Sequence, residues 1–387
     1  MKMKNCSTKE FIKNLKGRKI VCFGAGATML ITDIKEKPIE HLEKHIAFFV
    51  DNDKKKQGQK FHYMGHDFEI KSADVLNELS GKDYVLLITC IYYTEVYRQL
   101  KDITGLKEME CYLYEMVRSH PELDVEEFFT KELEKKAFKD WREILSGYNL
   151  KNKHKGKRCF LIGNGPSLTA EDLDLLKGEI TFASNRIYQL FDRTDWRPTY
   201  FFCIDAMFYR MDHEEINKVD AELRLVPLNR GLKAGKIYDE VTYYNRVADY
   251  AEVKNNQFSW KRQLRFSDDP EKVVYGGATV LYDAVQWAVY MGCPEIYLLG
   301  VDHNYKLEML EDGTIVETDM KKSHFTKQYE AGIEKFAAPV GAIHLSWQQA
   351  KESCSQRGVI IKNATRGGHL EVFERVSLEN LIRRDRG

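Results

Sequence analysis

The sequence predicts an α/β protein with two Rossmann-like modules, each on a mostly parallel sheet, joined by a helical connector. Two observations predict this class. Short apolar runs alternate with helical segments in both halves of the chain, which is typical of parallel sheets. Between the halves, aromatic and aliphatic residues recur at helical intervals among charges. For 387 residues we expect an N-terminal module over 1–116, a connector over 117–156 and a second domain over 157–387.

The composition excludes some classes of function. The chain carries 59 basic and 59 acidic residues, and a net charge of zero argues against nucleic acid as the main partner. The eight cysteines form no CxxC pair, so free thiols in a reducing compartment are expected. There is no apparent signal peptide, and no run approaches the ~18 apolar residues of a membrane span. We expect a cytoplasmic protein, and contact with the inner face of the membrane stays open.

The N-terminal module contains strand-like runs at 19–23, 46–50 and 84–89. Gly24-Ala25-Gly26 follows the first run and Asp51 ends the second, as in a dinucleotide-binding fingerprint. The third glycine of that fingerprint is missing. A tight structural turn is therefore the favoured interpretation. The basic loop at 151–158 is interpreted as a solvated linker rather than a phosphate or membrane patch.

The second domain has strand-like runs at 159–162, 180–183, 200–204, 223–227, 296–299 and 359–362, and helical patterns at 170–176, 279–291 and 346–357. Polar residues follow four of these strands: Asn164, Asn185, Asp205 and Asp302. In open α/β sheets, ligands bind beyond the carboxyl ends of the strands. We therefore expect these four residues to meet at one site.

Two glycine-containing turns indicate anion binding. Gly163-Asn164-Gly165-Pro166-Ser167 follows a strand, and its glycines let backbone N–H groups approach a ligand before a helix whose first turn suits Pro166. Gly276-Gly277-Ala278-Thr279 precedes an apolar helix, where phosphate binding and simple capping are both open.

Individual polar residues have alternative roles. Asn185 suits recognition of a base or ribose, because its amide both donates and accepts hydrogen bonds. Arg186 could meet a phosphate or form a surface salt bridge. Asp205 could bind a sugar hydroxyl or a metal, or cap the next segment. Asp302, after Gly300, could bind a hydroxyl or hold its own loop.

Histidine and tyrosine residues are the catalytic candidates. His303 and Tyr305 could flank a reacting phosphate, with Asn304 between them. His324 and His344 have side chains suited to general base catalysis near neutral pH. Metal-ligand spacing, the P-loop and the GxSxG elbow are all absent, so no metal site is predicted.

Taken in order, Ile162-Gly163-Asn164-Gly165-Pro166-Ser167-Leu168, Ser184-Asn185-Arg186-Ile187-Tyr188 and Tyr297-Leu298-Leu299-Gly300-Val301-Asp302 resemble motifs of bacterial lipooligosaccharide sialyltransferases and motility-associated flagellin glycosyltransferases. The segments 192–200 and 363–368 resemble bacterial members of the family grouped with archaeal 6-hydroxymethylpterin diphosphokinase. The resemblance covers roughly residues 156–376. The segments 49–53 and 56–58 resemble small modules attached to polysaccharide biosynthesis enzymes.

The sialyltransferase resemblance implies a CMP-activated nonulosonic acid donor and an inverting, metal-independent transfer to a glycan or lipid-linked acceptor. It implies that Gly163–Ser167 and Asn185 hold CMP and that Asp205 lies near the donor. Gly277–Thr279 would hold the carboxylate or phosphate, and His324 or His344 would take the acceptor proton. The family carries a tyrosine where Asn304 stands, with Tyr305 one residue later.

Two alternatives stay open. One is an ATP- and Mg²⁺-dependent diphosphokinase acting on a pterin-like alcohol, with Asp205 and Asp302 as metal ligands. The other is a non-catalytic nucleotide-sugar-binding scaffold. The resemblance is also compatible with a homo-oligomer.

Overall fold

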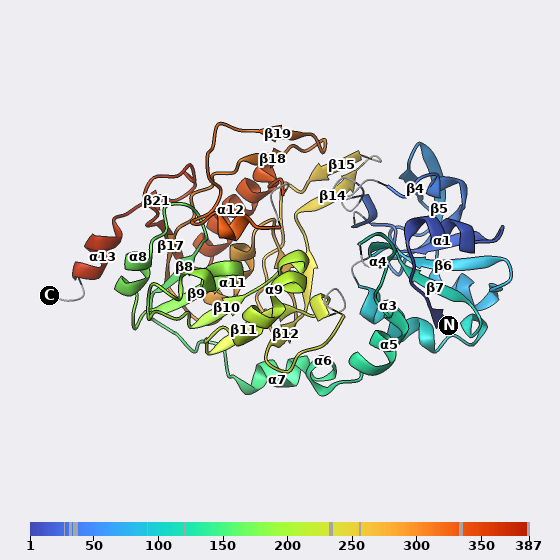
Figure 1. Ribbon diagram of the computed structural model, residues 1–387, viewed down its shortest axis with the longest axis horizontal. Helices are drawn as coiled ribbons and strands as arrows, with labels where there is room; N and C mark the ends of the chain where they lie inside the picture. Colours follow the sequence, from blue (N-terminus) through green and yellow to red (C-terminus); the bar gives the residue numbers. More distant parts are fainter. Residues whose placement is uncertain are drawn as a thin grey trace. The chain divides into compact units, whose positions relative to one another are not determined.

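The computed structural model describes residues 1–26, 28–30, 33, 38–90, 92–119, 121–231, 235–254, 257–332 and 336–384 (Figure 1). The chain divides into two compact units. Unit 1 comprises Met1–Lys135, Gly231–Ile237 and Glu252–Ser259, and unit 2 comprises Lys136–Arg230, Tyr238–Ala251 and Trp260–Gly387. The domain limits drawn from the sequence stay a prediction.

Unit 1 contains a seven-stranded sheet in the order β1-β7-β6-β2-β3-β5-β4, in which only the β4–β5 pair is antiparallel. Its strands are β1 (Lys2–Met3), β2 (Lys19–Phe23), β3 (Ile46–Val50), β4 (Lys60–Tyr63), β5 (His66–Lys71), β6 (Tyr84–Ile88) and β7 (Glu110–Leu113). Its helices include α1 (Thr8–Asn14), η1 (Leu42–Lys44), η2 (Ala73–Glu78), α3 (Tyr93–Lys101), η3 (Thr104–Leu106), α4 (Tyr114–Ser119), α5 (Val125–Glu127) and η4 (Phe128–Glu132).

Unit 2 contains an eight-stranded sheet in the order β12-β11-β10-β9-β8-β17-β20-β21, and every pair in it is parallel. Its strands are β8 (Cys159–Ile162), β9 (Ile180–Ser184), β10 (Tyr200–Phe202), β11 (Leu223–Pro227), β12 (Thr242–Tyr244), β17 (Glu295–Leu299), β20 (Ile360–Asn363) and β21 (Glu374–Arg375). The prediction of two mostly parallel α/β sheets is confirmed.

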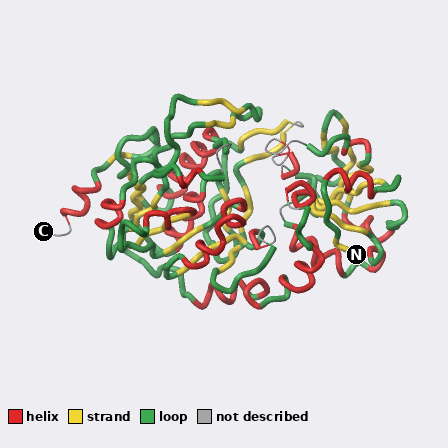
Figure 2. Tube along the Cα trace, in the orientation of Figure 1, coloured by secondary structure: helices red, strands yellow, loops and turns green. Residues whose placement is uncertain are grey.

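Helices and small sheets complete unit 2 (Figure 2). The helices are α6 (Lys136–Lys139), α7 (Trp141–Gly147), α8 (Ala170–Leu175), η5 (Asn185–Leu190), α9 (Ala206–Lys218), α11 (Val280–Tyr290), η6 (Gln328–Glu330), α12 (Val340–Ser355) and α13 (Leu378–Arg384). Two strand pairs lie outside the main sheet in unit 2: β13 (Arg246–Ala248) with β16 (Val274–Gly276), and β18 (Leu307–Met309) with β19 (Ile315–Glu317). A third pair, β14 (Ala251–Lys254) with β15 (Gln257–Trp260), belongs mostly to unit 1.

One predicted helix start is wrong, and so is the placement of Pro166 in a first helical turn, whereas the predicted helix start at 170 is confirmed. The last long helix begins at Val340 rather than at 346, directly after Pro339, so His344 lies within it. Because Gly341 has low helix propensity, the sequence pattern does not indicate this first turn. Helix α8 begins at Ala170, capped by Thr169, so Pro166 belongs to the preceding loop and not to a helical turn.

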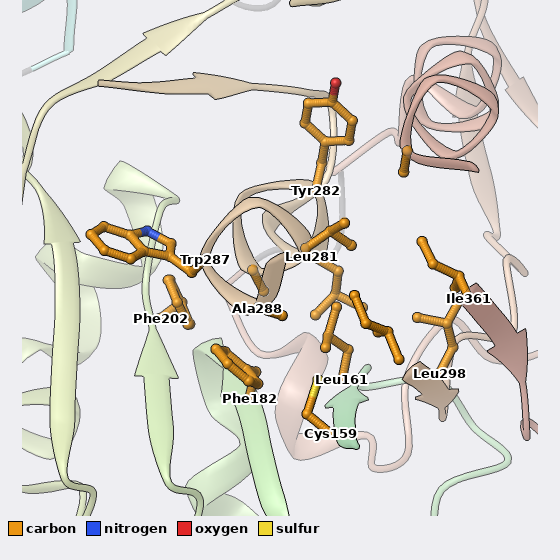
Figure 3. Packing of buried hydrophobic residues seen from close by; sticks show 14 of the residues in the cluster. Cys159, Leu161, Phe182, Phe202, Leu281, Tyr282, Trp287, Ala288, Leu298 and Ile361 are labelled. Atoms are coloured by element: carbon orange, nitrogen blue, oxygen red, sulfur yellow. The ribbon is translucent and has the colours of Figure 1, made fainter. Parts of the chain in front are cut away.

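The core of unit 2 holds α11 against the sheet (Figure 3). Residues 281–288 of α11 are buried on every side of the helix, as expected for a helix that is apolar all round. Leu281 and Trp287 pack with Leu161, Phe182 and Leu298 of the strands. Each such side chain contributes roughly 1.5–3 kcal/mol on burial. This packing fixes where the N-terminus of α11 points.

The eight cysteines are free thiols, as predicted. Among the described helices, none has both the length and the apolar composition needed to cross a bilayer.

Candidate active site

The candidate site lies at the boundary in the main sheet of unit 2 where the connections after two neighbouring strands run to opposite sides. Strands β8 and β17 are neighbours, with Ile162 opposite Leu299. The chain continues from β8 to β9 on one side and from β17 to β20 on the other. The loops beyond these two strands therefore diverge and leave a crevice, the usual ligand site of open parallel sheets.

The two loops bind each other through their backbones. Gly163 N–H donates to Leu299 O and Gly165 N–H donates to Gly300 O, each at 2.8 Å. A Cβ atom at Gly163 would lie 2.3 Å from Gly300 O. One at Gly165 would lie 1.9 Å from Asp302 Oδ2. Close approach of the two loops therefore requires both glycines, whether or not a ligand is bound.

Asp302 holds the first loop in place. The residue is 5% exposed, and its carboxylate accepts hydrogen bonds from the Ser167 hydroxyl at 2.8 Å and from Ser167 N–H at 3.2 Å. Burial raises the pKa of Asp302, and the hydrogen bonds from Ser167 oppose that rise. The Asp302 carbonyl accepts His369 N–H at 2.7 Å. Asp302 thus holds the backbone at Ser167 and His369 in place, and it also lines the crevice.

A cavity of ≈ 120 Å³ occupies this crevice. Ten of the predicted site residues line it: Gly163, Asn164, Gly165, Asn185, Thr279, Gly300, Asp302, Asn304, Tyr305 and His324. Seven others do not, among the residues that the structure describes: Pro166, Ser167, Asp205, Gly276, Gly277, Ala278 and His344. The lining comes from segments that are far apart in the sequence and converge only in the fold.

Five buried polar atoms of the cavity lining lack a hydrogen-bond partner within the described part of the chain. They are Asn164 Oδ1, Asn185 Oδ1, His303 Nδ1, Asn304 Oδ1 and His324 Nδ1. Leaving a buried polar group unpaired costs roughly 1–3 kcal/mol, and such groups are uncommon in folded proteins. Five of them on one cavity indicate a surface shaped for a polar ligand.

Asn185 occupies a left-handed backbone conformation, with φ 53°, which asparagine tolerates better than most residues. Its side chain forms a hydrogen bond with Tyr329, and burial raises the pKa of Tyr329 despite that bond. The neighbouring Arg186 is buried, and the salt bridge that it forms is internal rather than on the surface. It forms a buried two-point pair with Asp212 at 2.5 and 3.1 Å, and donates to Tyr329 O at 2.6 Å. These contacts position Asn185 and Tyr329.

Two histidines line the cavity, and both are neutral at pH 7. Burial, with lesser effects from His344 and His369, lowers the pKa of His303 to about 4. Burial also lowers the pKa of His324 to about 4, outweighing Glu330, whose Oε1 lies 3.8 Å from His324 Nδ1. The His324 ring stacks on Tyr329, with centroids 4.1 Å apart. A neutral imidazole with an unpartnered nitrogen can accept a proton.

His344 lies outside this cavity. It is exposed on α12, and its ring centroid is 6.2 Å from that of His303. The sequence singled out His324 and His344 as bases but gave His303 only a flanking role. The one local signal for His303 is its place directly after Asp302, at the end of β17.

The N-terminus of α11 forms another wall of the cavity through Thr279, Val280 and Leu281. Thr279 caps the helix. The two glycines before it are required by packing, since a Cβ at Gly276 would lie 2.1 Å from Arg246 Cζ and one at Gly277 would lie 2.7 Å from Ser346 Oγ. Ala278 N–H donates to Ser346 Oγ at 3.0 Å. These contacts therefore fix the position of the N-terminus of α11 at the crevice.

Asp205 serves as the N-cap of α9, accepting Met207 N–H at 2.7 Å and Phe208 N–H at 3.2 Å. This matches the capping alternative. Among the described residues, no group of three or more His, Cys, Asp or Glu side chains could hold a metal ion.

The glycine turn of unit 1 is also explained by internal contacts. Asp51 accepts Ala25 N–H and Lys56 Nζ, each at 2.9 Å. A Cβ at Gly24 would lie 2.6 Å from Cys90 Cβ. The acidic residue that would meet a ribose in a dinucleotide site holds the turn itself, in agreement with a structural role.

Comparisons with known proteins give two similarities. The chain has no match among curated proteins. A solved structure of the sialyltransferase CstII from Campylobacter jejuni, in complex with the substrate analogue cytidine-5'-monophosphate, is similar to it at 14% identity and a TM-score of 0.31, covering 58% of this chain and 86% of that one. Residues 135–308 match the family model described as 6-hydroxymethylpterin diphosphokinase MptE-like. The predicted resemblance to that family is confirmed: over residues 135–308 the chain is similar to MptE-like proteins.

Proposed function

We propose that unit 2 is a glycosyltransferase of cell-surface glycan biosynthesis that moves a nonulosonic acid from a CMP donor to an acceptor hydroxyl, with inversion and without a metal. The observation that carries the proposal is the cluster of five unpartnered polar atoms on one cavity at the change of direction of a parallel sheet. The sequence motifs around Gly163, Asn185 and Asp302 support it.

The chemistry of the cavity walls suits a nucleotide. The amide oxygens of Asn164, Asn185 and Asn304 are acceptors without donors, and ribose hydroxyls and the cytosine amine are donors. The N-terminus of α11 lies on the same cavity, and the dipole of a helix favours phosphate or carboxylate at that end. A ligand with hydroxyl and amine donors at one end and negative charge at the other complements both walls.

The cavity is smaller than the nucleotide sugar. Small-molecule pockets usually measure about 300–1,000 Å³, against ≈ 120 Å³ here. Part of the donor therefore lies in the mouth of the crevice, or side chains move when it binds.

The proposed reaction is a single displacement. The acceptor oxygen forms a bond to the anomeric carbon, the bond from that carbon to the phosphate oxygen breaks, and CMP leaves with the electron pair. The acceptor proton passes to an imidazole, for which His303 and His324 are the candidates because both line the cavity and each has an unpartnered Nδ1 atom in the described part of the chain. Burial raises the pKa of Tyr305, so its phenol stays protonated and suits donation of a hydrogen bond to the leaving phosphate.

The family description favours one alternative, the transfer of a diphosphate from ATP to a pterin-like alcohol. Its metal ions would need carboxylates such as Asp205 and Asp302. Both are engaged by other groups, since Asp205 caps α9 and Asp302 accepts Ser167. We therefore place the glycosyltransferase first. The donor is expected in the cytoplasm, and the acceptor is expected to be a glycan or a lipid-linked glycan.

The test compares the two reactions with the full chain. One sample contains CMP-N-acetylneuraminic acid, a mixture of oligosaccharide acceptors and EDTA, and release of CMP is measured. The other contains ATP, Mg²⁺ and 6-hydroxymethylpterin, and release of AMP is measured. The proposal predicts CMP release that survives chelation. Release of AMP that depends on both Mg²⁺ and the pterin, without release of CMP, would establish the alternative instead.

A further inference from the structure

A groove runs beside the candidate active site along one face of α12. His344, Gln348, Glu352 and Ser355 are spaced by three or four residues and are exposed, so they form one stripe on the helix. They line a cavity of ≈ 630 Å³. Eleven residue steps at a rise of about 1.5 Å make this stripe roughly 16 Å long. That length exceeds a single monosaccharide.

One end of the groove meets the donor cavity. His344 lines the groove and His303 lines the cavity, and their ring centroids are 6.2 Å apart. His303 also carries an unpartnered Nδ1 atom. A molecule lying in the groove would therefore present its end near the imidazole that can accept a proton.

The polar groups of the groove favour an uncharged ligand. Glu352 and Glu371 contribute carboxylates on its two walls. Lys351 is directed to the opposite wall, where its Nζ donates to Val372 O at 2.7 Å. Arg375 pairs with Glu371 at 2.6 Å and lowers the pKa of that carboxyl. Carboxylates and an amide bind sugar hydroxyls well. Lys351 and Arg375 balance the charge of the two carboxylates, so the groove has no excess positive charge to attract an anionic acceptor.

We infer that this groove is the acceptor site and that its ligand is a neutral oligosaccharide, whose terminal hydroxyl lies at the His344 end beside His303. The inference rests on the proposed function and names the acceptor class of that same site. The donor occupies the cavity at β8 and β17, and the acceptor lies along α12.

The test uses the fluorescently labelled full chain, saturated with CMP, on a printed array that holds neutral and anionic oligosaccharides. The variants Gln348→Ala and Glu352→Ala change exposed side chains of the groove, so the fold should persist. Glu214→Ala, an exposed glutamate on α9, is the matched control. Stabilisation of each protein by CMP in a thermal-shift assay reports the donor cavity separately.

The inference predicts binding to at least one neutral oligosaccharide. It also predicts a loss of at least tenfold in each groove variant, no change in Glu214→Ala, and an unaltered CMP shift in all of them. Three results would overturn it: glycan binding that is unchanged in the groove variants, a preference for anionic glycans, or CMP binding with no neutral glycan bound. Absence of CMP binding by the unmodified chain would instead overturn the proposed function, and failure of both assays would overturn both.

Discussion

Gly165→Ala tests the clamp between the two loops of the site. The added methyl would lie 1.9 Å from Asp302 Oδ2 and 2.8 Å from Gly300 O, which no side chain can occupy without movement. The backbone at Gly165 is not in the left-handed region, so collision is the main source of the effect. Either the loops separate, or Asp302 turns away from Ser167.

The magnitude follows from these two outcomes. Overpacking costs typically 1–3 kcal/mol, and loss of hydrogen bonds to a charged carboxylate costs about 1.5–3 kcal/mol. The two terms overlap, so we expect a loss of about 3 kcal/mol. For a unit of this size, that corresponds to roughly 6–12 °C in Tm. The CMP-induced thermal shift should be lost as well, because the loop lines the cavity.

Equilibrium unfolding in urea, followed by tryptophan fluorescence, measures this loss. All five tryptophans lie in unit 2, so the signal reports the unit that contains the site. Gly147→Ala is the matched control, because a Cβ there meets nothing within 4 Å and alanine favours the helix. A Gly165→Ala protein as stable as Gly147→Ala would refute the clamp.

Two further predictions concern charge. Arg246→Ala leaves Asp283, which is 0% exposed, without its ionic partner, and should cost about 3–5 kcal/mol. Lys177→Ala, which breaks an exposed pair, should leave the free energy of unfolding almost unchanged in the same assay, and equal losses in the two variants would contradict the burial of the first pair. Because the pKa of His303 falls from 6.5 to about 4 on folding, the native state binds fewer protons between those pH values. Stability from His303 is therefore present above pH 6.5 and lost as pH falls toward 4, by about 2 kcal/mol at pH 5. His303→Gln should remove that part of the pH dependence. Urea titrations measure the loss of unfolding free energy between pH 7 and pH 5 for both proteins. A loss in His303→Gln as large as in the unmodified chain would show that His303 is solvated.

Much of the fold follows from local sequence. Runs such as 159–162 and 296–299 are apolar throughout, which suits strands covered on both faces, and the glycines after them mark where they end. Local sequence also explains why Asn164, Asn185 and Asp302 could be predicted to lie at one edge of the sheet. Each directly follows its strand, and parallel strands bring their carboxyl ends together.

The remaining features depend on contacts between distant segments. The residues near Arg186 in the sequence do not indicate that it pairs with Asp212 in the fold. His303 and His344 look alike in the sequence, yet only His303 is desolvated, because burial is a property of the packed fold. Asp205 satisfies two backbone N–H groups of α9, and its strand-end position alone cannot distinguish capping from ligand binding.

Calorimetric titration of CMP in EDTA into the unmodified chain, Asn185→Gly and Asn149→Gly tests the central claim most directly. Both asparagines have positive φ, 53° and 51°, which glycine adopts without strain, so the variants differ mainly in the amide that each removes. The account predicts that the unmodified chain and Asn149→Gly bind CMP alike and that Asn185→Gly binds at least tenfold more weakly. Equal CMP binding by Asn185→Gly, or no CMP binding by the unmodified chain, would contradict it.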